Sequence, residues 1–179
     1  MLFNLFKKTE PAVIFTDKIF ISTEAKINAC IALAKQEPDV LLIGWFADTV
    51  KEYQSIFARE LLDKNKIVDV KYLHAGKINN NRPVFLEHFP LYSKEKDLVE
   101  KWGLQKIDVY NSLQEPLFKK LGGENIIALM KQMGIKENEM IEHPLISKSI
   151  RNAQEKIAQK LNFEHSADSQ KEWIEKNIC

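Results

Sequence analysis

The chain of 179 residues has little cysteine, and its two cysteines, Cys30 and Cys179, are far apart. Neither belongs to a CxxC pair or to a cluster with histidine, and this excludes the usual zinc-ligand spacings and a disulfide framework. We therefore predict no metal site. A protein without disulfides also fits a reducing compartment, so we predict a cytoplasmic location.

An excess of charge of either sign is also absent. Lysine and arginine number 26 against 25 aspartates and glutamates, which gives a net charge of +1. A dedicated nucleic-acid binder depends on a strong basic excess, so we predict no such role.

No apolar run reaches the ~18 residues that a membrane-spanning helix needs, so we predict that the chain is not an integral membrane protein. The start, "MLFNLFKKTE", places apolar residues before its lysines, the reverse of a secretory signal. We predict that Leu2, Phe3, Leu5 and Phe6 pack onto the body of the protein. The alternative is a weak contact with a membrane surface or a partner.

The first two thirds of the chain alternate between strand and helix patterns. The strand patterns cover residues 12–22, 39–46, 67–75, 84–90 and 106–113, and the helix patterns cover 22–36, 47–65 and 93–103. Ser22 or Thr23 is the expected cap of the first helix, and Asp48 is that of the second. Strand, helix and strand at these lengths form βαβ units, so we predict a mainly parallel α/β sheet with 39–46 as a central strand.

After Leu113 the pattern becomes helical. Short helices are expected to stop at Gly122 and at Gly134, and a long amphipathic helix covers 143–161. Its inward positions are Ile146, Ile150, Ala153 and Ile157. We predict an α/β domain over 1–113 and a helical C-terminal segment over 114–179 that packs on it.

The order of residues in this helical part resembles a known family. The shared positions are Tyr110, Ser112, Leu113, Glu115, Leu117, Phe118, Gly122, Met133, Gly134, Glu137, Glu139, Ile141, Glu142, His143, Ser147, Ser149, Ile150, Ala153 and Gln154. They resemble the segment of the preprotein-translocase ATPase SecA in which the second motor domain runs into the helical scaffold. The stretches "KIFISTEAKINACIALA", "DVLLIGWFADTVKEYQSIFARELLDKN" and "KYLHAGK" add a weaker match to the same domain. The resemblance implies a RecA-like, helicase-C-like half.

The chain also departs from that family. It has no G-x-x-x-x-G-K-[ST] phosphate loop and no Asp-Glu pair after an apolar strand to hold Mg²⁺. The family's Gly-Arg-Gly-Thr-Asp and arginine-finger segments would fall between Lys77 and Lys106, where Arg82 is the single arginine. The resemblance therefore implies a motor domain without its nucleotide-sensing half, with no catalytic residues, no ATP hydrolysis and no cofactor.

A candidate ligand site follows from the strand that ends at Gly44 and Trp45, because open α/β sheets bind ligands beyond the carboxyl ends of their strands. Its proposed members are Gly44, Trp45, Asp48, Thr49, His74, Lys77 and Arg82, with His88 nearby. A lysine and an arginine beside a helix start suit a phosphate or carboxylate. The alternative is a polar rim without a ligand. The set has no nucleophile with its own base, so it predicts no reaction.

The other histidines suggest structural roles. Glu87 and His88 are neighbours on a predicted strand and point to opposite faces, so they do not act as a pair. We predict that His143 begins a helix before Pro144 and that His165 is exposed.

Three functions remain open at this stage. The first is a non-catalytic SecA-related module that binds a protein partner or itself, with Trp173 and Ile174 as partner contacts. The second is a small-ligand or nucleotide-binding protein that uses the sheet edge near Gly44, Lys77 and Arg82. The third is a fragment that works in trans with a catalytic translocase domain.

Overall fold

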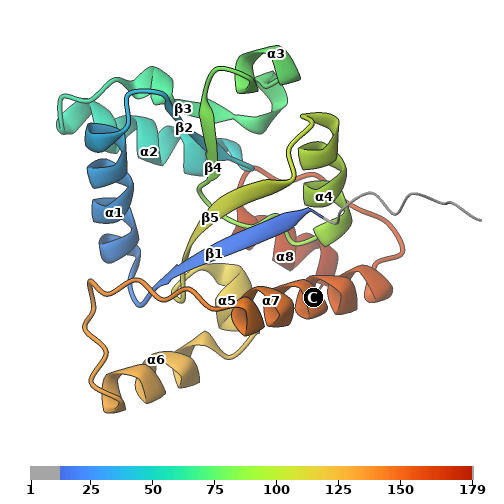
Figure 1. Ribbon diagram of the computed structural model, residues 1–179. Coiled ribbons are helices and arrows are strands. Elements are labelled where there is room, and N and C mark those ends of the chain that lie inside the picture. Colours follow the sequence, from blue (N-terminus) through green and yellow to red (C-terminus); the bar gives the residue numbers. More distant parts are fainter. Residues whose placement is uncertain (1–12, 179) are drawn as a thin grey trace, which may run out of the picture.

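The computed structural model describes residues 13–178 and contains a five-stranded sheet (Figure 1). Its strands are β1 (Ile14–Phe20), β2 (Val40–Gly44), β3 (Ile67–Asp69), β4 (Arg82–Phe85) and β5 (Lys106–Ser112). All pairs are parallel, in the order β1-β5-β4-β2-β3, which confirms the predicted α/β class. The expectations for Leu2, Phe3, Leu5, Phe6 and Cys179 lie outside the described residues.

Strand β2 is an interior strand between β4 and β3, while β4 occupies the middle of the sheet. All five residues of β2 are buried, and Leu42 and Ile43 have no exposed surface. A continuous apolar run is the pattern of a strand covered on both faces, and the structure shows that arrangement here.

Two predicted strands differ from the observed ones. The stretch 67–75 forms only the short β3, and the chain then turns through two short helices. Strand β4 starts two residues earlier than the predicted 84–90 and ends at Phe85, so Glu87 and His88 lie beyond it. The second residue of β4 is Pro83, which has no N–H to donate to a neighbouring strand. No hydrogen bond is lost, because pairing with β5 begins only at Val84.

Helices cover both faces of the sheet. They are α1 (Thr23–Gln36), α2 (Ala47–Arg59), η1 (Lys64–Lys66), η2 (Val70–Tyr72), α3 (Ala75–Ile78), α4 (Tyr92–Lys101), α5 (Pro116–Lys120), α6 (Gly123–Gln132), α7 (Pro144–Lys160) and α8 (Gln170–Ile178). Helices α1 and α2 pack on one face around Leu42 and Val84. Helices α3 and α4 pack on the other face around Ile43 and Phe85.

The helix ends mostly follow the predicted signals. Ser22 is the N-cap of α1, and its side chain accepts a hydrogen bond from the N–H of Ala25 at 3.1 Å. Gly122 and Gly134 both adopt positive φ angles, 83° and 80°, after helices α5 and α6. The prediction for Asp48 was wrong, because α2 begins after Phe46 and has no side-chain cap.

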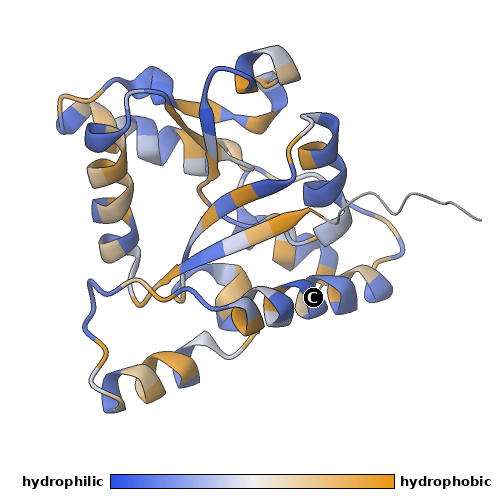
Figure 2. Cartoon of the chain, viewed as in Figure 1, coloured by the Kyte–Doolittle hydropathy of each residue, from blue (hydrophilic) through white to orange (hydrophobic). Residues whose placement is uncertain are grey.

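Of the last four helices, α7 packs on β1, α5 and α8 pack on each other, and α6 contacts α5 and projects from the sheet. Helix α7 lies beside β1, and just before α7 Ile141 forms an antiparallel bridge with Ile19 (Figure 1). Apolar segments concentrate in the strands and in the inner faces of these helices (Figure 2). In α7, Ile150 is buried and Ile146, Ala153 and Ile157 are half-buried, as the helical spacing predicts.

Candidate functional site at the carboxyl edge of the sheet

The carboxyl ends of β2 and β4 form the crevice where the direction of the chain connections changes. From β2 the chain continues to β3 on one side, and from β4 it continues to β5 on the other. This is where α/β proteins with open sheets usually bind ligands. Gly44 ends β2 here, and its lack of a side chain lets α2 approach, since a Cβ would lie 2.7 Å from Cγ2 of Val50.

Glu87 binds the start of α2 across this crevice. One carboxylate oxygen accepts the N–H of Trp45 at 3.3 Å, and the other accepts the hydroxyl of Thr49 at 2.9 Å. Burial raises the pKa of Glu87 to about 7, although the positive charge of Lys26 opposes that rise. Glu87 therefore ties the end of β2 to the first turn of α2, and its pKa lies near neutral pH.

Lys26 crosses from α1 to the same region. Its ammonium group donates to the carbonyl of Leu86 and, at 2.5 Å, to Oε1 of Glu115. Burial disfavours the ammonium form, but the charges of Glu115 and of neighbouring groups such as Glu87, together with the hydrogen bond to Glu115, outweigh it and raise the pKa of Lys26. A cavity of about 240 Å³ lies beside this pair and is also lined by Glu87.

His88 points to the opposite side of the sheet from Glu87 and sits between two carboxylates. Its Nε2 lies 2.5 Å from Oδ1 of Asp17, and its Nδ1 lies 3.0 Å from both oxygens of Glu95. All three side chains are at most 2% exposed. Burial disfavours the imidazolium, but the charges of Glu95 and Asp17 outweigh it and hold the pKa of His88 well above its ordinary value.

Asp17 stays ionised in this environment. Burial alone would raise the pKa of Asp17, but His88 and nearby hydrogen-bond donors reverse the effect and lower it. Oδ1 accepts a hydrogen bond from the amide of Asn111 at 2.9 Å. Oδ2 has no direct hydrogen-bond partner among residues 13–178, although the Ser147 hydroxyl is close enough to contribute to the lowered pKa.

Two glutamines connect this network to the last helices. Gln154 of α7 donates to Oε2 of Glu95 at 2.9 Å and to the carbonyl of Phe89 at 2.7 Å. Gln170 of α8 donates to the carbonyl of His88 at 2.9 Å and accepts the N–H of Leu117 at 2.8 Å. The turn after β4 is therefore held by both α7 and α8.

Aromatic side chains close the crevice between β2 and β4. The ring of Phe89 lies 5.2 Å from Trp45, 5.6 Å from Phe46 and 5.6 Å from Trp173 of α8. The N–H of Asp48 at the start of α2 donates to the carbonyl of Asp168 at 2.9 Å. The chain's own C-terminal part thus covers much of the site that the strand order marks for a ligand and leaves the cavity of about 240 Å³ beside Glu87.

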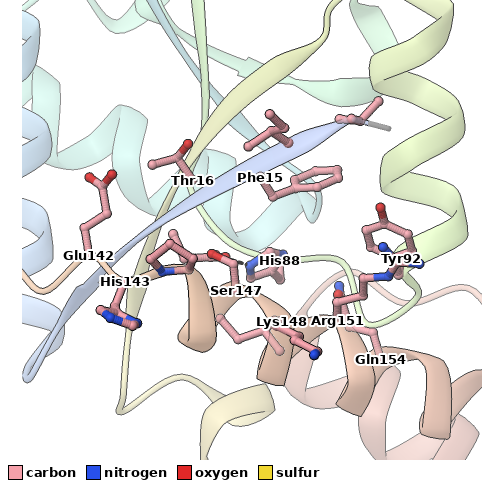
Figure 3. Close-up of a pocket in the computed structure, with 15 residues that line it drawn as sticks. Phe15, Thr16, His88, Tyr92, Glu142, His143, Ser147, Lys148, Arg151 and Gln154 are labelled. Atoms are coloured by element: carbon pink, nitrogen blue, oxygen red, sulfur yellow. Dashed lines mark hydrogen bonds and ion pairs between the residues drawn. The ribbon is translucent and has the colours of Figure 1, made fainter. Parts of the chain in front are cut away.

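A larger cavity of about 420 Å³ lies between β1 and α7 (Figure 3). Its wall on the β1 side is mainly apolar, from Val13 to Phe15, with the carboxylate of Asp17 and the ring of His88 behind it. Helix α7 supplies Ser147 and Arg151 on the other side. In Figure 3 the ring of Tyr92 stands at the right of this cavity and His143 at the left.

The structure does not bring all the predicted ligand-binding residues together. Gly44, Trp45, Asp48 and Thr49 lie at the carboxyl edge, as expected. Arg82 begins β4 opposite Val40, at the amino end of the sheet, and forms ion pairs with Glu37 and Asp108. His74 and Lys77 are exposed in and beside α3, which precedes β4. Arg82 does not join Gly44, because a residue that starts a strand and one that ends its neighbour lie at opposite edges. His74 and Lys77 belong to the connection between β3 and β4 and are not seen in contact with Gly44.

The other predicted positions have structural surroundings. Trp173 and Ile174 are buried and pack in one cluster with Leu117 and Phe46. Their role as partner contacts stays a prediction. His143 is the N-cap of α7, and its ring accepts the N–H of Leu145 at 3.2 Å. His165 is exposed, as predicted.

Sequence reasoning missed the buried charges and amides. Asp17, Glu95, Gln154 and Gln170 lie in patterns that suggested ordinary strand or helix surfaces. Gln154 carried a weak signal, because it lies next to Ala153 on the inward stripe of α7. Within residues 13–178, no group of three or more metal-ligating side chains is arranged to hold an ion, and no helix has the length and apolarity to cross a bilayer.

The fold and the closed crevice define an α/β protein with a parallel sheet and a helical end packed on it. No protein-family model matches the chain. Part of the chain is similar to the protein translocase subunit SecA. It is 46% identical over 48 residues to SecA of Acinetobacter baumannii and 46% identical over 55 residues to SecA of Acidithiobacillus ferrooxidans.

These matches are short on both sides. They cover 27% and 31% of this chain but only 5% and 6% of the two SecA proteins. A SecA from Acinetobacter baylyi is 44% identical over 48 residues, with the same coverage as the first. The resemblance to SecA is therefore supported over a limited part of the chain.

Proposed function

We propose that this chain is a non-catalytic, SecA-related accessory protein that binds another protein. The observation that carries the proposal is the closed crevice between β2 and β4. Phe89, Trp45 and Trp173 occupy the place where an α/β protein of this topology would hold a nucleotide. A nucleotide would have to displace α8, whose Trp173 is only 1% exposed.

Two sequence features support the same proposal. The chain has no phosphate-cradling glycine loop, so the backbone N–H groups that bind nucleotide phosphates are missing. Its similarity to SecA is limited to a short stretch. The matched proteins are named translocase subunits, and we therefore propose a component of a protein translocase as the partner.

The competing proposal of a small-ligand or nucleotide site at Gly44, Lys77 and Arg82 has weaker support. Arg82 is held by Glu37 and Asp108 at the opposite edge of the sheet from Gly44. A ligand would need to span the whole length of the strands to touch both.

The test has two arms. In the first, purified chain and purified SecA from the same cells are mixed, and binding is measured by biolayer interferometry with an unrelated parallel α/β protein as control. We expect saturable binding to SecA and none to the control. In the second, phosphate release from ATP is measured with Mg²⁺ present, and we expect no turnover above background. Absence of SecA binding, or turnover that Lys77→Ala abolishes, would contradict the proposal.

A further inference from the structure

Helix α7 has a second stripe beside its inward one, and residues 13–178 cover this stripe only in part. Its members are Ser149, Asn152, Ala153, Lys156, Ile157 and Lys160, and all of them line an open groove of about 570 Å³. They follow each other in steps of three and one residues, so they form one continuous strip along the helix.

Helices α5 and α8 supply the other side of the groove (Figure 1). Lys120 belongs to α5, Leu121 follows it, and Ile178 ends α8. The apolar residues Leu121, Ala153, Ile157 and Ile178 are each half-buried. They form an apolar floor that remains in contact with solvent.

The rim of the groove is basic. Helix α7 contains three lysines and one arginine but a single acid, Glu155, and this acid is paired with Arg151. The ammonium groups of Lys156 and Lys160 form no ion pair or hydrogen bond among residues 13–178. The net charge of the whole chain is only +1, so positive charge is concentrated on this helix. Charge complementarity therefore favours an acidic occupant.

The spacing along the groove favours a helical occupant. Ala153 and Ile157 are four residues apart, and so are Lys156 and Lys160, which places an apolar row and a basic row side by side along α7. A second helix with the same period packs its apolar residues between such rows. A membrane surface fits less well, because it would lie across the rim and would not enter the groove.

We propose that the groove between α5, α7 and α8 binds an acidic amphipathic helix of a partner protein. This proposal rests on the proposed function and names the surface and the chemistry of the partner. The bound helix lies along α7 with its apolar residues on Leu121, Ala153 and Ile157. Its glutamates pair with Lys156 and Lys160.

The probe is a fluorescein-labelled peptide, ELEQLLAELEQLLA, with acetylated and amidated ends. As a helix it places its leucines on one face and its glutamates on the two flanks of that face. One control, LLELEALQELQLEA, has the same composition with its leucines spread around the helix. The other control replaces each glutamate of the probe by glutamine. Fluorescence anisotropy with the full chain should show saturable binding of the probe and at least about tenfold weaker binding of each control.

Charge reversal in the chain tests the place of binding. Lys156→Glu with Lys160→Glu reverses the charge of the rim, and Lys131→Glu with Lys136→Glu makes the same change at two exposed lysines outside the groove. We expect the first pair to weaken binding of the probe at least about tenfold, because repulsion replaces attraction at two positions. The second pair should leave binding within about twofold.

A second pair of variants tests the groove without changing charge. Asn152→Trp places a large ring in the groove, whereas Gln159→Trp places it at an exposed position of α7 that does not line the groove. We expect only Asn152→Trp to prevent binding of the probe. The replaced residues are exposed, so thermal melts should show that all variants keep the fold. The peptide comparisons use the unmodified chain and stay decisive if a variant does not fold.

Two other occupants are outcomes of the same test. Cosedimentation with phosphatidylglycerol vesicles that only the Lys156→Glu, Lys160→Glu variant loses would assign the basic rim to a membrane. A dimer in analytical ultracentrifugation that only this variant dissociates would assign the groove to a second copy of the chain. Either result would overturn the proposal.

Three peptide results would also overturn it: no binding of the probe, equal binding of the probe and the control with spread leucines, or binding that both groove variants leave intact. A chain that binds SecA but not the probe would retain the proposed function and lose this docking site. A chain that binds the probe but not SecA would do the reverse.

Discussion

Two parts of the sheet are covered to different extents: the crevice between β2 and β4, and the outer edge of β1. The crevice is closed by the rings of Phe89, Trp45 and Trp173 and by the last helix. The β1 edge is left with a cavity and an unpartnered carboxylate oxygen. Both places keep a cavity and a buried carboxylate oxygen without a direct hydrogen-bond partner among residues 13–178, Oε2 of Glu115 at the crevice and Oδ2 of Asp17 at β1. The comparison teaches that the two regions differ in how far the last helix covers them and not in whether they retain polar groups.

His88 supports both regions, and its loss is expected to have the largest effect. In His88→Ala two buried carboxylates, Asp17 and Glu95, lose their shared positive partner. Removing one partner of a buried ion pair costs about 3–5 kcal/mol, so we expect at least that loss in the free energy of unfolding. Urea unfolding measures it.

The control for that substitution is His143→Ala. His143 is exposed and caps α7 through one hydrogen bond, so its loss should cost about 1 kcal/mol. Equal effects of the two alanine variants would contradict the importance of the buried network.

The closed crevice depends on Trp173. We expect Trp173→Ala to lower the free energy of unfolding by about 3–5 kcal/mol, because the side chain is packed against Phe89 and Leu117. Phe163→Ala, at an exposed aromatic residue, should change it by no more than about 0.5 kcal/mol. An unchanged melting temperature for Trp173→Ala would instead indicate a side chain held out for a partner.

Helix α7 forms one side of the open edge, and its inward face should be part of the core. Ile150→Ala should destabilise the chain by about 2–5 kcal/mol, since Ile150 is buried against Leu113 and Phe118. Arg151→Ala should cost about 0.5–1 kcal/mol, because its guanidinium lies on the exposed side and contacts the ring of Tyr92. Thermal melts of the two variants compare them, and the reverse order would show that α7 is not docked as described.

The pH dependence of stability tests the crevice, through the raised pKa of Glu87. The pKa of Glu87 is about 7 in the folded chain and about 4.5 when it is unfolded. Between these pH values only the folded state holds the proton, so this group makes stability fall as the pH rises, by up to about 3 kcal/mol.

Glu87→Gln removes that titration. We expect the free energy of unfolding of the wild type, relative to this variant, to be higher at about pH 5 than at about pH 7.5. Urea unfolding of both proteins at the two pH values provides the measurement. A constant difference between them would show that Glu87 does not bind a proton on folding.

Most of the element pattern could be predicted from the sequence. The apolar run 39–46 becomes the buried β2, and the four-three-four spacing of Ile146, Ile150, Ala153 and Ile157 becomes the inner side of α7. Both signals are local, because burial on one face imposes the period of the element itself. The caps at Ser22 and Gly134 are local for the same reason.

The candidate site depended on tertiary structure. Arg82 and Lys77 suggested a ligand beside Gly44, but the parallel register places the start of β4 and the end of β2 at opposite edges. Asp17, His88 and Glu95 come from three separate elements, and none of them is marked as buried by its own neighbours in the sequence. A charge becomes stable inside a protein only when distant partners neutralise it and satisfy its hydrogen bonds. The alternation of polar and apolar residues therefore determined the strands and helices, while the packing of α4, α7 and α8 against the end of β4 decided which charges are buried and which edge stays open.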